Sequence, residues 1–179
     1  MVPADFHDFF AAIAAVSGAL IGLLFVAVSL APERTVGGAA TAVAKATAGL
    51  AFIAFTNTLG VSLLALIPGE HVGVAAVVMA GWSISATLAL SAQIFVRRRA
   101  QAPGWRWVGL SAASLLVFGV QLASGIAILA TPDDRSAVTW IAVIGVVLSA
   151  IGIARAWELL GAQTLGLVSD FRRWRSSRR

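Results

Sequence analysis

The sequence predicts an all-α protein that crosses a membrane five times, and three observations lead to this fold class. Of the 179 residues, 59% are hydrophobic and only 12% are charged, whereas charged residues make up about a quarter of a soluble domain. Five apolar stretches are long enough to span a bilayer, at about 9–30, 46–67, 72–96, 107–129 and 137–157. The distribution of Lys and Arg, the third observation, alternates between the segments that separate them. We therefore assign residues 1–158 to one polytopic transmembrane domain.

The first stretch, residues 9–30, contains 22 residues and no charged side chain. At ~1.5 Å of rise per residue, a helix of this length spans about 33 Å, the thickness of a bilayer core. Ala14, Gly18 and Gly22 recur at every fourth position, and small residues at this spacing let a second helix approach at backbone distance. The same spacing recurs at Gly81 and Ser85 and at Gly145 and Ser149. We expect most of these helix-packing residues to lie inside the bundle and one or two faces to serve self-association.

The other stretches end at turn-forming or charged residues. Pro68 and Gly69 separate the second from the third, three arginines at 97–99 end the third, and Pro132 separates the fourth from the fifth. If the N-terminus lies outside, twelve of the 13 Lys and Arg residues fall on the inside, and Arg135 alone falls outside. Cytoplasmic segments carry such an excess of positive charge, so we predict an N-terminus outside and a C-terminus inside.

Residues 159–179 are predicted to form a basic, amphipathic cytoplasmic tail. Apolar side chains recur along one helical stripe and the arginines lie largely off it, which suits a helix on the inner surface of the bilayer or a continuation of the fifth helix into the cytoplasm. The predicted lipid-surface residues are Arg172, Arg173, Trp174 and Arg175. The alternative is a basic tail that only fixes the topology. We predict no nucleic-acid binding, because the sorting of positive charge to the inside already accounts for the basic residues.

The middle of each predicted span lacks Asp, Glu, Lys, Arg and His. Arg155 and Glu158 come closest, at the inner end of the fifth span, where we expect an ion pair at the membrane interface. Ion-coupled pumps and proton relays use intramembrane ionisable groups, so this pattern argues against active transport and against intramembrane hydrolysis. The chain has no cysteine and no nucleotide-binding or hydrolase motif, and we predict that it is not an enzyme and binds no cofactor.

Neutral polar side chains remain at mid-depth, namely Asn57, Thr87 and Gln121. A side-chain amide in hydrocarbon costs free energy unless it is hydrogen-bonded, so each amide needs a protein partner or water. These residues either line a pore or bond one helix to another, an interaction of about 0.6–2 kcal/mol.

Five carboxylates fall on the predicted outer face, which together with Arg135 gives this face a formal charge of −4. They are Asp5, Asp8, Glu70, Asp133 and Asp134. Such an acidic rim can concentrate cations at a pore mouth. His7 and His71 lie beside some of these carboxylates in the sequence, but their spacing does not demand a metal ion, and we predict none.

The first stretch, FFAAIAAVSGALIGLLFVAVSL, and the segment LIPGEHVG after the second span resemble a family of small, mostly uncharacterised bacterial inner-membrane proteins. The first helix of that family reads roughly FFxxxAxxxAxLxGLxFVAxSL, and some members are labelled modulator of FtsH protease. Family members commonly have Asn after the Ser-Leu pair, whereas this chain has Ala31 and Pro32. The resemblance implies a multi-pass protein of the bacterial inner membrane and brings no catalytic residues.

Three functions fit the sequence. The first is a homo-oligomeric passive channel that favours cations and is lined by Asn57, Gln121 and Thr87. The second is a non-enzymatic accessory protein that binds another membrane protein, such as a protease, through its small-residue faces and binds lipid through its tail. The third is a facilitator for a small neutral solute.

Overall fold

The computed structural model describes residues 4–30, 39–68, 71–97, 105–131 and 135–159. A short 3₁₀ turn, η1 (Ala4–Phe6), leads into five long helices. These are α1 (His7–Leu30), α3 (Ala39–Leu66), α4 (His71–Arg97), α5 (Trp105–Ala130) and α6 (Arg135–Leu159). Each contains 22 or 23 consecutive residues that are apolar enough to cross a membrane. The all-α fold class with five such helices is therefore confirmed, while the N-out, C-in orientation stays a prediction.

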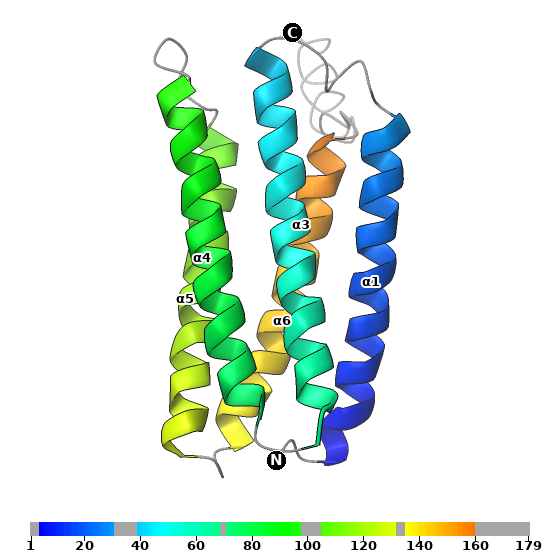
Figure 1. Ribbon diagram of the computed structural model, residues 1–179, viewed down its shortest axis with the longest axis vertical. Coiled ribbons are helices and arrows are strands. Elements are labelled where there is room, and N and C mark those ends of the chain that lie inside the picture. Colours follow the sequence, from blue (N-terminus) through cyan, green and yellow to red (C-terminus); the bar gives the residue numbers. More distant parts are fainter. Residues whose placement is uncertain (1–3, 31–38, 69–70, 98–104, 132–134, 160–179) are drawn as a thin grey trace, which may run out of the picture.

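Four of the helices form a closed ring. In the order α3, α4, α5, α6, each helix packs against the next, and α6 packs back against α3 (Figure 1). α1 lies outside this ring, against α3 and α6. Successive helices run antiparallel, so α1 starts at one end of the bundle and α6 stops at the other (Figure 1). Short connections between long helices favour this up-and-down order.

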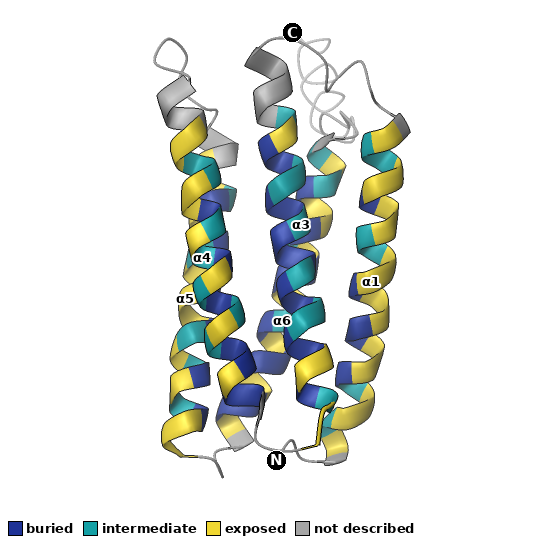
Figure 2. Ribbon diagram, in the orientation of Figure 1, coloured by how far each residue is buried: buried dark blue, intermediate teal, exposed yellow. Residues whose placement is uncertain are grey.

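α3 is the most buried helix because α1, α4 and α6 all pack against it. In its most apolar segment 56% of the residues are buried, compared with 22% in α1. Figure 2 shows the same contrast, with buried residues along much of α3 and long exposed faces on α1 and α4. The core consists of three groups of buried side chains, to which α3 contributes Val61, Leu50 and Phe55 respectively.

The outward surface of the bundle is apolar. Leu23, Leu116 and Trp140 are each more than half exposed. Contiguous exposed apolar surface promotes association in water, whereas lipid tails solvate it at no cost. This surface therefore fits a bundle that is surrounded by lipid.

Two glycines set close contacts between helices. Gly125 of α5 lies against α4, where a Cβ would come within 3.0 Å of the Val77 backbone nitrogen. Gly152 of α6 lies against the ring of Phe55 on α3, which occupies the space that a side chain would need. Gly125 does not belong to a pattern of small residues at four-residue spacing, because the residues four positions before and after it are Gln121 and Leu129.

Candidate functional site

Two side-chain amides near mid-depth bond their helices to α4. Asn57 of α3 is 1% exposed, and its Nδ2 donates to the Met79 carbonyl oxygen at 3.0 Å and to Ser83 Oγ at 2.8 Å. Met79 and Ser83 are one turn of α4 apart, so a single amide group reaches both. Gln121 of α5 is also 1% exposed, and its Nε2 donates to the Ala76 carbonyl oxygen at 3.2 Å. α4 thus accepts hydrogen bonds from both of its neighbours in the ring.

Asn57 and Gln121 also line one cavity inside the bundle, so the structure brings these two predicted residues together. Thr58 and Ser62 of α3 supply further polar groups, and apolar side chains of α1, α3 and α6 complete the wall. The cavity volume is about 10 Å³, enough for one water molecule. Thr87, the third predicted lining residue, is fully buried on α4 but is not part of this wall.

Replacing Asn57 with leucine tests whether this amide bonds helices together. We expect the free energy of unfolding to fall by about 1–2 kcal/mol, because two interhelical hydrogen bonds are lost while an apolar group of similar size is kept. Unfolding by SDS of the detergent-purified protein, followed by Trp fluorescence, measures the change. The matched control is Ser85→Ala, because the exposed Ser85 hydroxyl bonds the Gly81 carbonyl oxygen of its own helix at 2.8 Å. Equal stability of the two variants would contradict the bonding role.

Arg155 is the largest side chain that the described part of the bundle buries completely. We expected this residue at the membrane interface, in an ion pair with Glu158. The residue does lie near the C-terminal end of α6, but its side chain is buried inside the bundle with 0% exposure, and its Nη2 donates to Ser111 Oγ of α5 at 3.0 Å. Glu158, nearly one turn further along α6, is half-buried and attracts the guanidinium. Burial inside the bundle does not move Arg155 to mid-depth, so the prediction that the middle of each span lacks ionisable side chains is unchanged.

Arg155 lies on the buried face of α6. Arg155 follows Gly152 by three residues and Leu148 by seven, and both of these residues are buried. Residues at these spacings share one face of a helix. A cation is also favoured near the C-terminus of α6 by the helix dipole. Arg155 therefore shares the buried face of α6 with Leu148 and Gly152.

Some of the predicted helix-packing residues lie inside the bundle. Ala14 of α1 and Ser149 of α6 are buried. Gly145 of α6 faces α1 and α3, since a Cβ there would lie 3.3 Å from Ile13 Cδ1 and 3.5 Å from Thr58 Cγ2. These three residues allow α6 and α1 to pack closely against their neighbours.

The remaining helix-packing residues face outward. Gly18, Gly22 and Gly81 have no described atom of another element within 4 Å of the position that a Cβ would take, and Ser85 is exposed. Each four-residue step turns a helix about 40° beyond a full turn, so Gly22 lies about 80° around the α1 axis from Ala14. The prediction of one packing face at Ala14, Gly18 and Gly22 is therefore wrong for contacts within this chain.

The predicted acidic rim and lipid-surface residues lie largely outside the described residues. Asp5 and Asp8 are exposed at the start of the first helical segment, where His7 Nδ1 lies 3.9 Å from Asp8 Oδ1. The positions outside the described residues are Glu70, Asp133, Asp134, Arg172, Arg173, Trp174 and Arg175. Within the described ranges, no group of three His, Cys, Asp or Glu side chains is placed to hold a metal ion.

Comparisons of the chain with protein-family models, with curated proteins and with solved structures find no match. Its resemblance to the family of small inner-membrane proteins accordingly stays a prediction.

Proposed function

We propose that this chain is a non-enzymatic integral membrane protein that acts by binding other transmembrane helices through the exposed face of α1. The observation that carries this proposal is the outward position of Gly18 and Gly22. Glycine weakens a helix by about 1 kcal/mol relative to alanine and offers lipid no side chain. It does allow a second helix to approach at backbone distance, which supports the accessory role among the three predicted functions.

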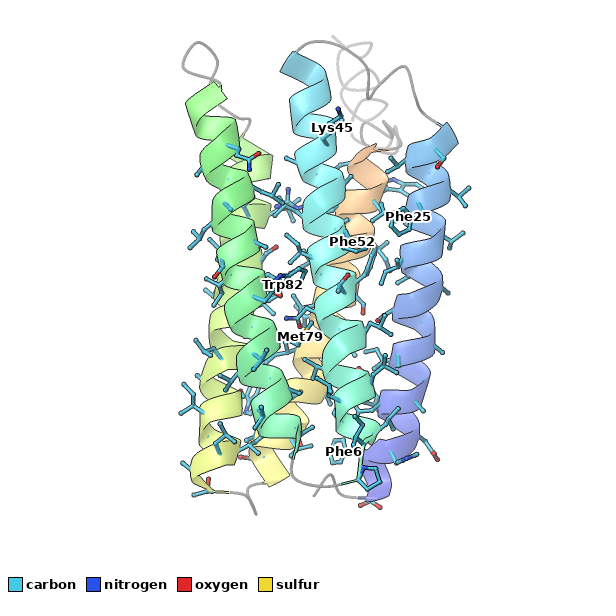
Figure 3. The ribbon with its side chains drawn as sticks, viewed as in Figure 1. Phe6, Phe25, Lys45, Phe52, Met79 and Trp82 are labelled. Carbon is cyan, nitrogen blue, oxygen red and sulfur yellow. The ribbon has the colours of Figure 1, made fainter. Side chains whose placement is uncertain are left out.

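We define the α1 small-residue face by four exposed residues that lie within about 60° around the helix axis. They are Ala11, Ala15, Gly18 and Gly22. α1 is also the least buried of the five helices in the described residues, since it packs against α3 and α6 from outside the ring. Phe25 of α1 and Phe52 of α3 point toward each other, with ring centroids 5.8 Å apart (Figure 3). This contact helps to hold α1 in place while its small-residue face stays open to a partner.

The positions of the deep polar residues favour association over conduction. Asn57, Gln121 and Thr87 are all buried inside the chain, so none of them would line a pore at the axis of an oligomer. Outward-facing side chains at mid-depth are mostly apolar, such as Leu116, and the exposed Ser85 hydroxyl donates to a carbonyl oxygen of its own helix. A channel would have to run through the chain itself, where the cavity beside Asn57 and Gln121 has room for about one water molecule.

The partner that we favour is a second copy of the chain. Small-residue faces on identical helices are self-complementary, since each copy offers the other the same close approach about a two-fold axis. A different membrane protein, such as a protease, is the alternative partner.

The lack of native cysteine makes the test direct. Ala15→Cys places a thiol on the α1 small-residue face, and we expect most of the protein in native membranes to form a disulfide-linked dimer on oxidation. Such a bond requires Cα atoms within about 7 Å. Adding Gly18→Leu and Gly22→Leu should abolish the dimer band on a non-reducing gel.

Leu116→Cys is the matched control, because Leu116 of α5 is 68% exposed but lies away from α1. Equal dimer yields at both positions would refute a specific α1 interface. A cross-link to a different protein would identify a heterologous partner. Cation flux into liposomes that contain the purified protein would instead support the channel.

A further inference from the structure

The side-chain oxygen of Gln121 is buried and has no hydrogen-bond partner among the described residues. The amide nitrogen of the same side chain donates to the Ala76 carbonyl oxygen, which fixes the orientation of the group, since two oxygens cannot hydrogen-bond to each other without a proton. An amide oxygen left without a donor in the protein interior destabilises the folded state. The Gln121 oxygen therefore requires a donor.

The cavity that Gln121 lines is small, and its polar groups include hydrogen-bond acceptors. Thr58 Oγ1 donates its proton to the Ala54 carbonyl oxygen at 3.1 Å, so its lone pairs are what it can present to the cavity. Ser62 is also on the wall, and the rest is largely apolar. A volume of about 10 Å³ admits one molecule of the size of water. The site therefore selects a very small hydrogen-bond donor.

We propose that this cavity binds a single structural water molecule, which donates a hydrogen bond to Gln121 Oε1 and bonds to hydroxyl groups of Thr58 and Ser62. α3 and α5 lie across the ring from each other, with α4 and α6 between them. Asn57 and Gln121 already tie α3 and α5 to α4, and the water adds a polar link across the ring. Buried waters commonly satisfy polar groups that the protein leaves unpaired. This site is independent of the α1 small-residue face.

Gly145 provides a variant that fills the cavity. Gly145 is part of the wall, and a methyl group there would lie 3.5 Å from Thr58 Cγ2. Gly145→Ala should therefore displace the water. Val61→Ile adds a methyl group from another part of the wall and serves as a second filling variant. Gly109→Ala is the control, because Gly109 is exposed on α5 with no described atom of another element within 4 Å of the added methyl.

Solid-state NMR of the ¹⁵N-glutamine-labelled protein in lipid bilayers can detect a water molecule next to the Gln121 side chain. The side-chain signal of Gln121 is identified by its loss in Gln121→Leu. We expect magnetisation transfer from water to this amide in the wild-type protein and in Gly109→Ala, and its loss in Gly145→Ala and Val61→Ile. The transfer is measured in each filling variant separately, so the test needs only one of the two variants to fold. No transfer in the wild-type protein, or transfer that survives a folded filling variant, would overturn the proposal.

Discussion

Gly125→Leu should lower the free energy of unfolding by about 3 kcal/mol or more, because a side chain there has no space to enter. A Cβ on Gly125 would lie 3.0 Å from both the Ala76 Cβ and the Val77 backbone nitrogen of α4. A flexible side chain could move away, but the α4 backbone can yield only if the helix shifts as a whole. Such a shift would also disturb the hydrogen bond from Gln121 to the Ala76 carbonyl oxygen.

SDS-induced unfolding of the purified protein in detergent measures this effect. Gly119→Leu is the matched control, because Gly119 is exposed on the same helix and has no described atom of another element within 4 Å of an added Cβ. We expect the control to keep or raise the stability, since leucine has the higher helix propensity by roughly 0.8 kcal/mol. A similar result for both variants would show that α4 and α5 do not approach closely at Gly125.

Arg155→Ala should cost about 3 kcal/mol, which makes it the second large effect. The substitution removes the donor to Ser111 on α5 and the charge that attracts Glu158, and it leaves a void in place of the largest fully buried side chain. The double variant Arg155→Met and Glu158→Gln should recover part of this loss. It replaces both charges by neutral groups and keeps most of the buried volume.

The same SDS titration compares these variants with Lys45→Ala. Lys45 is exposed near the start of α3 and provides a matched loss of one positive charge (Figure 3). Changes to exposed residues usually stay within about 0.5 kcal/mol. If Arg155→Ala destabilised the protein no more than Lys45→Ala, the burial of Arg155 inside the bundle would be refuted.

Hydropathy was sufficient to predict the number and the approximate bounds of the membrane-spanning segments. The largest difference is at α3, which begins at Ala39, whereas the apolar stretch was placed at 46–67. Hydropathy marks the residues that favour lipid, while a helix continues through any residues that tolerate its backbone geometry. Residues 39–45 are mostly small or unbranched and have adequate helix propensity, so α3 extends beyond its apolar part.

The candidate site was predictable in part. The cost of an unpaired amide in lipid was enough to single out Asn57 and Gln121 as residues that need partners. Their partners were not predictable, because two of them are backbone carbonyl oxygens of α4, which every residue type provides. The inward position of Arg155 was not recoverable from the sequence, because its spacing to Leu148 and Gly152 indicates burial only once the structure shows that those two residues are buried.

Which side of each helix faces the interior of the bundle could be determined only from the tertiary structure. In water an amphipathic pattern indicates the buried side of a helix, but in lipid the buried and the exposed sides are both apolar. The small residues therefore show that another helix can approach α1 closely, but they do not identify that helix. Ala14 meets the rest of the chain while Gly18 and Gly22 do not, and that division depends on the rotation of α1 against α3 and α6.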